Sequence, residues 1–326
     1  MSTSYRLNKF LKYSSSTITT LVLGFFSITG AMANFNEGEG IQKITDRVFV
    51  IHGSLDLPNA ENKGFMNNPV IALGDNGVVV IDPGSSSDIG RYIIEQVKKL
   101  SSKPITHVLS THIHGDHWLG NHAIFEEYPQ AQFFAHPDMI SAANAGEADR
   151  WIALLNSLTS GATAGTSAHI PDNALHDGQN LAIPGLPIRV HLSDHAHTTT
   201  DAMFELIDES VVILGDNGLN GRIGRMDDGH FLGNITALKK VIDINAKWYV
   251  PGHGKTGTIE VATKYHNYLK MIHDAAKHYG EDFMPAFEIK QTIEEDFKAY
   301  ASWHSFDEQF GRHVSLASLE VEQDAF

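Results

Sequence analysis

The chain has 326 residues, with 39 acidic against 24 basic side chains, a net charge of −15 and no cysteine. This length suffices for one large domain with a substantial core. The negative charge repels phosphate backbones and disfavours a nucleic-acid partner, while the lack of thiols excludes disulfides, a cysteine nucleophile and thiolate metal ligands.

The first 33 residues carry three basic and no acidic side chains, and an apolar stretch covers about residues 18–32. The stretch ends in Ala31-Met32-Ala33, a small-x-small pattern typical of signal-peptide cleavage, and it is shorter than the roughly 20 residues that span a bilayer. We therefore predict a secretory signal peptide over residues 1–33, cut after Ala33. The mature protein would be periplasmic or secreted, without stable membrane insertion. An uncleaved N-terminal anchor is the alternative.

Two β-rich blocks are predicted along the mature chain, each followed by alternating strands and helices. The predicted strands lie at 44–53, 69–82, 105–109, 132–135, 188–194, 202–208, 211–216 and 248–250. Asp75-Asn76-Gly77 divides the second of these as a hairpin turn, because Asn and Gly tolerate positive φ. The predicted helices lie at 87–100, 118–128, 137–144, 234–244 and 259–279.

A β-rich block that occurs twice predicts an α/β fold with two sheets back to back and helices outside, which is a four-layer αββα sandwich. The segment 146–187 is less periodic and rich in Gly and Pro, so we interpret it as a variable lid or insert. We assign residues 34–280 to one domain. Residues 281–326 are predicted to be a more polar helical extension of that domain.

The most informative motif is Thr111-His112-Ile113-His114-Gly115-Asp116-His117, directly after the strand predicted at 105–109. Side chains two apart in a strand share a face, so His112 and His114 would bind one ion. Asp116 and His117 follow the bend at Gly115 and would bind a second ion nearby. Four ligand-type side chains within six residues favour a metal site over a chance cluster.

Three further motifs place potential ligands at the ends of predicted strands, where loops commonly form sites. They are Asp194-His195-Ala196-His197-Thr198, Leu214-Gly215-Asp216 and Val250-Pro251-Gly252-His253-Gly254. Spacing alone leaves His195 and His197 as competing ligands, because residues two apart in a strand point the same way.

With Asp82 in Val-Val-Val-Ile-Asp-Pro-Gly, these motifs resemble those of the metallo-β-lactamase-fold hydrolase superfamily, in the same order, over about residues 44–275. The resemblance implies one ion held by His112, His114 and His197, and a second held by Asp116, His117 and His253. It also implies that Asp216 bridges both ions. The pattern small residue, His, Thr favours His197, and leaves His195, His52 and His136 as packing or hydrogen-bonding residues.

Asp82 matches the acid that orients metal ligands through hydrogen bonds, and capping of the turn at Pro83-Gly84 is an equal alternative. In the loop after Asp216, Arg222 and Arg225 are candidate ligands for an anionic substrate group, with solvated loop cations as the alternative. His230 is a candidate pocket residue.

The predicted function is therefore an exported metallohydrolase with two zinc ions, although this ligand set also suits iron or manganese. A hydroxide shared by the ions would attack an ester, thioester, lactone or amide of a small molecule, with Asp116 steering it or relaying its proton. Asp116 and Asp216 are the predicted catalytic residues.

Three alternative functions remain open. The first is a β-lactamase of the cysteine-free, all-His/Asp type, which the resemblance disfavours because that type lacks an acid at the position of Asp216. The second is a mononuclear iron enzyme similar to persulfide dioxygenases. The third is a non-catalytic periplasmic metal-binding protein.

Overall fold

The computed structural model describes residues 40–324, so the predicted signal peptide lies outside the described residues. Within 40–324, no helix has the length and apolarity needed to cross a bilayer.

The first sheet is a seven-stranded mixed sheet in which the strands follow one another in chain order. Its strands are β1 (Ile41–Lys43), β2 (Val48–Ile51), β3 (Val70–Leu73), β4 (Val78–Ile81), β5 (Ile105–Leu109), β6 (Gln132–Ala135) and β7 (Asn173–Ala174). Strands β1 to β4 pair antiparallel, whereas β4 to β7 pair parallel. The hairpin predicted at Asp75-Asn76-Gly77 is confirmed, because β3 and β4 pair across it and Gly74 N donates to Gly77 O at 2.9 Å.

The second sheet has five strands in the order β12-β11-β10-β9-β8. They are β8 (Asn180–Ile183), β9 (Leu186–Ser193), β10 (Asp201–Leu206), β11 (Val211–Gly215) and β12 (Trp248–Pro251). Only β11 and β12 pair parallel in this sheet, so it is also mixed. The predicted strands of the second block are thus confirmed.

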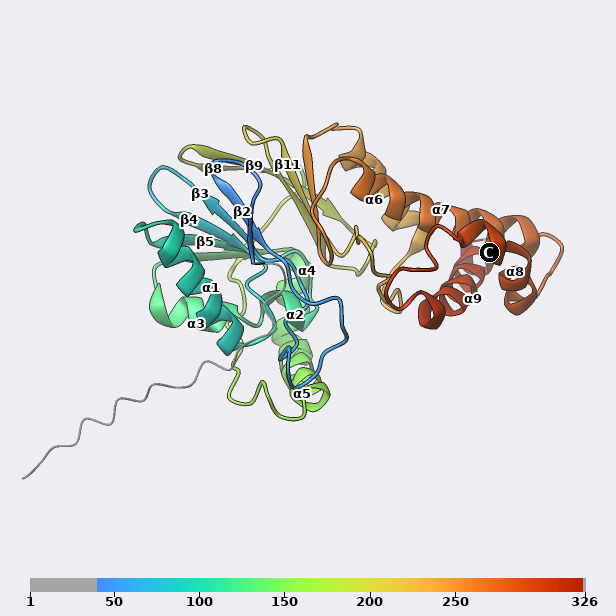
Figure 1. Cartoon of the computed structure of the whole chain (residues 1–326), viewed down its shortest axis with the longest axis horizontal. Coiled ribbons are helices and arrows are strands. Elements are labelled where there is room, and N and C mark those ends of the chain that lie inside the picture. The colour runs from blue at the N-terminus through green and yellow to red at the C-terminus, as the bar shows by residue number, and fades with distance from the viewer. Residues whose placement is uncertain (1–39, 325–326) are drawn as a thin grey trace, which may run out of the picture. The chain divides into compact units, whose positions relative to one another are not determined.

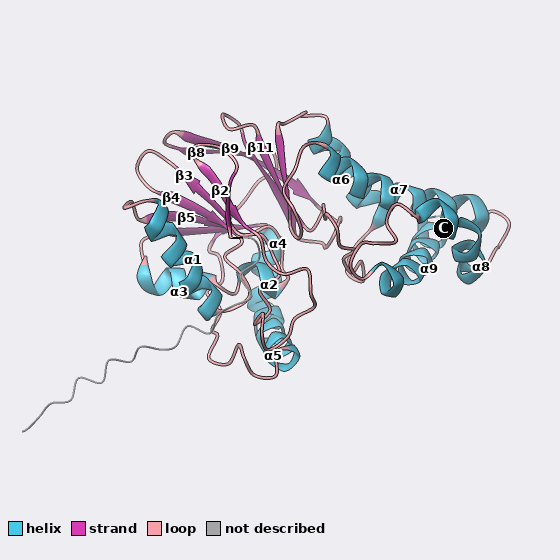
Figure 2. Cartoon of the chain, in the orientation of Figure 1, coloured by secondary structure: helices cyan, strands magenta, loops and turns pink. Residues whose placement is uncertain are grey.

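One hydrophobic core lies between the two sheets, and others lie between each sheet and its helices. Strand β4 explains how: Val79 and Ile81 pack into the cluster that joins both sheets, while Val78 and Val80 pack on the opposite side against helices. A strand buried on both faces reads as a continuous apolar run, as Val78–Ile81 does. Figure 2 shows the resulting layers of helix, sheet, sheet and helix, which confirm the predicted αββα architecture.

The outer helices cover the two sheets separately (Figure 1). On the first sheet lie α1 (Ser87–Leu100), α2 (Gly115–Trp118), α3 (Asn121–Glu127), α4 (Pro137–Ala142), a π-helical turn (Ala143–Glu147) and α5 (Ala148–Leu158). On the second lie α6 (Phe231–Ile242) and α7 (Glu260–Gly280), and on α7 pack α8 (Ala286–Ile293), a 3₁₀ turn (Glu294–Phe297) and α9 (Phe306–Asp324). The helix predicted at 118–128 is therefore two helices, which meet at Leu119 and Gly120.

The segment after residue 285 packs into the molecule more closely than its polar composition predicts. Phe297, Phe306, Phe310 and Val314 are buried in one cluster with residues of α6 and α7. Most polar residues of α9 occupy its outer face, although Gln309, His313 and Glu320 are buried, so an average over the segment conceals its apolar stripe.

Candidate metal centre

All five motifs meet at one edge of the two sheets, where β4, β5, β11 and β12 end. His112 and His114 reach this edge from a loop, because β5 already ends at Leu109 and α2 begins at Gly115. Strand alternation was therefore the wrong reason to place these two histidines together. The tight turn into α2 brings them side by side, with their ring centroids 4.7 Å apart.

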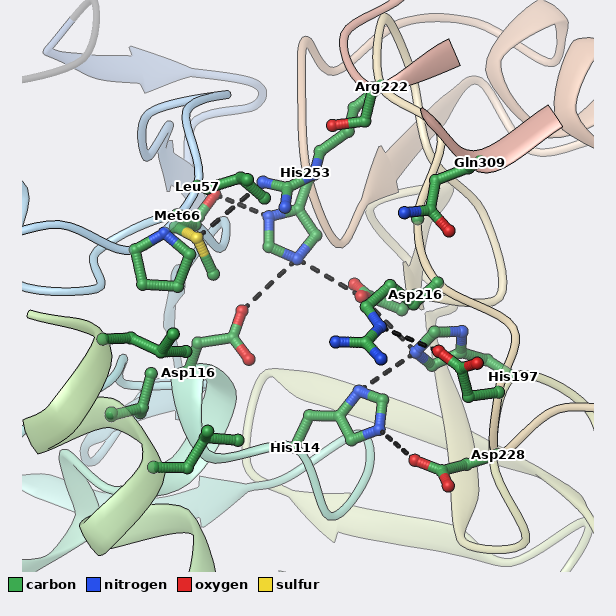
Figure 3. Close-up of a pocket in the computed structure, with 18 of the residues that line it drawn as sticks. Leu57, Met66, His114, Asp116, His197, Asp216, Arg222, Asp228, His253 and Gln309 are labelled. Atoms are coloured by element: carbon green, nitrogen blue, oxygen red, sulfur yellow. Dashed lines mark hydrogen bonds and ion pairs between the residues drawn. The ribbon is translucent and has the colours of Figure 1, made fainter. Parts of the chain in front are cut away.

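The ligand-type side chains form two adjacent groups. His112, His114, His197 and Asp216 offer atoms within 4.8 Å of one another, and Asp116, His117 and His253 form a second set by the same measure. All seven residues that the sequence motifs single out as metal ligands are thus brought together. Figure 3 shows five of them: His114, Asp116, His197, Asp216 and His253.

Asp216 lies between the two groups. Its Oδ1 is 3.2 Å from His117 Nε2, and its Oδ2 is 3.2 Å from His253 Nε2 and 3.6 Å from His197 Nε2. It follows Gly215 at the end of β11, where any larger residue would meet Thr111, since an added Cβ would lie 2.7 Å from Thr111 Cβ. This close approach places the carboxylate at the centre of the cluster.

His197, and not His195, joins the cluster. His197 is buried, and its Nε2 lies 3.1 Å from His114 Nδ1. His195 is exposed, and its Nε2 lies 3.2 Å from the carbonyl oxygen of Asp228. The turn between β9 and β10 is irregular, so these two side chains do not share a direction as they would in a strand.

Asp82 organises the back of the cluster. Its Oδ2 lies 2.8 Å from His117 Nδ1 and accepts a 2.7 Å hydrogen bond from Thr111 Oγ1, while its Oδ1 accepts one of 2.8 Å from Thr111 N. Thr111 Oγ1 in turn lies 3.0 Å from His112 Nδ1. The carboxylate thus orients His117 directly and His112 through Thr111, which is the first of the two roles considered for Asp82. The backbone of Asp82 has a φ of 55°, a conformation that non-glycine residues rarely adopt.

Two other histidines also have an outer partner. His253 Nδ1 lies 2.8 Å from the carbonyl oxygen of Met66, and His114 Nε2 lies 3.3 Å from Asp228 Oδ2. A carbonyl or carboxylate oxygen accepts, so it holds the facing ring nitrogen protonated and leaves a lone pair on the inner nitrogen. The sequence analysis missed Asp228, because nothing near it in the chain marks a partner of His114.

The inner nitrogens fit a metal ion. Within residues 40–324, His112 Nε2 and His117 Nε2 are buried and have no hydrogen-bond partner. Burial lowers the pKa of His112 well below its usual value and that of His197 to about 3, so both rings are neutral. Neutral imidazoles and carboxylates are the ligands that zinc, iron and manganese accept.

The carboxylates and imidazoles of the cluster shift one another's pKa values. Burial lowers the pKa of His117, but Asp216, Asp116 and Asp82 together raise it well above the usual value. Burial likewise raises the pKa of Asp216, and His253 and His117 outweigh this effect and hold it well below the usual range. The ring of His117 and the carboxylate of Asp216 therefore attract each other strongly across the site.

A cavity of about 450 Å³ opens onto the cluster and is lined by His114, Asp116, His197, Asp216 and His253. Helix α5, from the segment predicted to be a lid or insert, forms one wall of it. Residues of α9 and of the loop 222–228 form another.

The three candidate substrate residues differ in position. Arg222 lines the cavity, but its Nη1 donates to the carbonyl oxygens of Leu55 and Asp56 at 3.3 and 3.5 Å. Its guanidinium therefore holds the loop that contains Leu55 and Asp56 in place. Arg225 also lines the cavity, and its Nε donates to Asp227 at 2.8 Å.

The expectation that His230 belongs to the pocket is wrong. His230 does not line the cavity. It caps α6, with Nδ1 accepting from Gly233 N at 3.1 Å, and it lies 3.3 Å from Glu320 of α9. His52 and His136 form local hydrogen bonds, as predicted for non-ligand histidines.

The fold and the cluster define an αββα protein with two neighbouring His/Asp groups that are suited to metal ions. The family model of the metallo-β-lactamase superfamily matches residues 63–253. The chain belongs to this superfamily, as its motifs predict.

Curated relatives are distant. A lactamase-like protein, adaB, of Aspergillus niger is 24% identical over 244 residues, which are 74% of this chain and 66% of that protein. An atrochrysone carboxyl ACP thioesterase of Pseudocercospora fijiensis is 26% identical over 70% of this chain and 59% of its own length. A hydroxyacylglutathione hydrolase of Prochlorococcus marinus is 27% identical over 54% of this chain and 60% of its own length. The chain thus spans less than two thirds of each.

Solved structures match over the same region. A metallo-β-lactamase from Pontibacter korlensis superposes with a TM-score of 0.57 at 17% identity, over 71% of this chain and 98% of that one. The β-lactamase DIM-1 gives a TM-score of 0.56 at 15% identity, over 71% and 96% of the two chains. At this identity the likeness shows the fold alone.

Proposed function

We propose that the protein is a hydrolase with two divalent metal ions, zinc in the first place, that cleaves an ester, thioester, lactone or amide bond of a small molecule. The position of Asp216 carries the proposal, because its carboxylate faces imidazoles of both ligand groups. Its oxygens lie 3.2 Å from His117 and His253 of the second group and 3.6 Å from His197 of the first. A carboxylate so placed suits a pair of ions better than a single one.

His112, His114 and His197 would hold one ion, and Asp116, His117 and His253 the other, with Asp216 touching both. When bound, such a pair of ions lowers the pKa of a shared water toward neutrality and polarises the substrate carbonyl. Asp116 lines the cavity and lies 3.4 Å from His253 and 3.6 Å from His117, so it can also receive a proton and pass it to the leaving group. Asp82 keeps His117 in the binding tautomer.

Thioesters are the first substrates to test, because two of the relatives are named as a thioesterase and as a hydroxyacylglutathione hydrolase. The test combines elemental analysis of the purified protein with thioester, ester, lactone and amide panels, and nitrocefin beside them. We expect two metal ions per chain and turnover in the thioester panel. Cleavage of nitrocefin alone would establish the β-lactamase alternative, and one iron per chain with oxygen uptake the oxygenase alternative.

Asp216→Ala separates a catalyst from a metal-binding protein without activity. We expect turnover to fall at least a hundredfold. Asp208→Ala, in the exposed turn between β10 and β11, is the matched control and should keep full activity. Equal activity of Asp216→Ala and the parent would refute the role of Asp216.

From the N-terminal sequence we also propose export to the periplasm or the medium, with small molecules and not nucleic acids as partners. Mass spectrometry of the exported protein should find Asn34 as its first residue. An intact N-terminus on membrane-bound protein would instead show an uncleaved anchor.

A further inference from the structure

The cavity beside the cluster has one apolar wall. Helix α5 and the loop before β3 supply it, and its apolar side chains are Leu57, Pro58, Trp151, Leu154, Leu155 and Leu158. Arg150 of α5 also lines the cavity and pairs with Glu147 at 2.7 Å. The four apolar residues from α5 follow the spacing of one helix face. Leu57 and Leu158 are 49% and 47% exposed, and together with the other apolar side chains of this wall they leave an apolar surface open to a ligand.

This apolar wall begins at the ligands themselves. The ring of Trp151 lies 4.8 Å from the ring of His114, centroid to centroid. Helix α5 also packs on α2 so closely that a Cβ on Gly115 would lie 2.9 Å from Trp151 Cβ and 3.2 Å from Leu155 Cδ1. A group bonded to a carbonyl at the cluster would therefore run directly along this wall toward Leu158.

The opposite wall is polar. The loop 222–228 supplies Arg225, Asp227 and Asp228, and α9 supplies Glu308 and Gln309. Figure 3 shows Asp228 and Gln309 on this side of the cavity. Covering such charged groups with hydrocarbon would remove their water without replacing its hydrogen bonds. The two walls thus favour different ends of a substrate.

We propose that the substrate is an acyl compound with an apolar acyl chain, which lies on the α5 wall, and a polar leaving group, which faces Gln309 and the loop 222–228. The inference rests on the proposed hydrolysis. In that step the water oxygen bonds to the acyl carbon, the C–S or C–O bond breaks, and the departing sulfur or oxygen receives the proton. A polar leaving group can replace the hydrogen bonds that the polar wall makes with water, whereas an apolar acyl chain cannot, which assigns the polar wall to the former.

The test uses acetyl, butyryl, hexanoyl and octanoyl thioesters of N-acetylcysteamine. Thiol release is read with a thiol reagent, and the protein contributes no background because it has no cysteine. We expect kcat/KM to rise roughly threefold to fourfold for each methylene that is buried on the wall. Leu158→Ser and Leu57→Ser should flatten this dependence. Leu319→Ser, equally exposed on α9 and outside this cavity, should leave it unchanged.

Binding of octanoate and acetate to the metal-loaded protein, measured by calorimetry, separates the two proposals. Octanoate should bind at least tenfold more tightly than acetate, and Leu158→Ser should remove most of the difference. Turnover that does not depend on acyl length, or that rises only with alkyl groups on the thiol side, would overturn this inference and leave the hydrolase proposal standing. If no acyl compound is cleaved, the hydrolase proposal fails. Independently of turnover, equal binding of octanoate and acetate would overturn the inference that the α5 wall binds an acyl chain.

Discussion

Exchange of Asp82 for asparagine is the sharpest test of how the centre is built. The carboxylate accepts from Thr111 N, Thr111 Oγ1 and His117 Nδ1 at 2.7 to 2.8 Å, and all three donors are buried. An amide has one accepting oxygen. If that oxygen serves Thr111 N, the amide NH₂ faces His117 Nδ1 and forces the other tautomer, which places a proton on the inner Nε2.

We expect Asp82→Asn to weaken binding of one of two zinc ions by about tenfold to a hundredfold, which is about 1.4–2.7 kcal/mol. Replacing one charge-assisted hydrogen bond by a mismatch should also lower the free energy of unfolding by about 1.5–3 kcal/mol. Binding of the other ion should weaken less, because its ligand His114 has Asp228 as its outer partner and only His112 is linked to Asp82, through Thr111.

The assay is a two-site competition titration against a zinc-binding dye, with ¹⁵N shifts of the imidazoles to report the His117 tautomer. Asp177→Asn is the matched control, since its carboxylate also accepts from a backbone amide, at 2.9 Å from Leu192 N, but lies on the surface. Unchanged affinity for both ions in Asp82→Asn, with the parent tautomer at His117, would refute the reasoning.

Three further predictions follow from the same geometry. We expect the His197→Ala variant to bind one metal ion and the His195→Ala variant to bind two, as measured by elemental analysis. Equal metal contents in the two variants would contradict this prediction. Asp228→Ala should lower the affinity for one metal ion about tenfold, because the outer nitrogen of His114 loses its hydrogen-bond partner. A titration curve identical to that of the parent would contradict this prediction. Burial lowers the pKa of His313 to about 4, below its value near 6.5 in the unfolded chain, so the unfolded state binds more protons between these values. The free energy of unfolding should therefore fall by about 3 kcal/mol as the pH drops from 6.5 to 4, and His313→Gln should show a smaller drop in urea titrations at the two pH values.

Much of the fold follows from local sequence signals. The hairpin at Asp75-Asn76-Gly77 and the helix at Ser87–Leu100 are short-range features, with turn residues or helical periodicity confined to a few neighbours. The boundary inside 118–128 was not predicted, because Leu119 and Gly120 interrupt the helix through packing. Gly120 lies so close to Pro83 that an added Cβ would be 2.3 Å from its carbonyl oxygen.

By itself the sequence determined which side chains gather at the centre, since each ligand lies in a short motif at the end of a strand and such motifs do not depend on distant contacts. Only the tertiary structure decided the pairing of Asp228 with His114 and the exclusion of His230 from the cavity, and it confirmed His197, which the motif resemblance favoured over His195. These depend on loop conformations and on α9, whose Glu320 holds the start of α6. Residues far apart in the chain meet there through packing, and no local pattern in the sequence encodes that meeting.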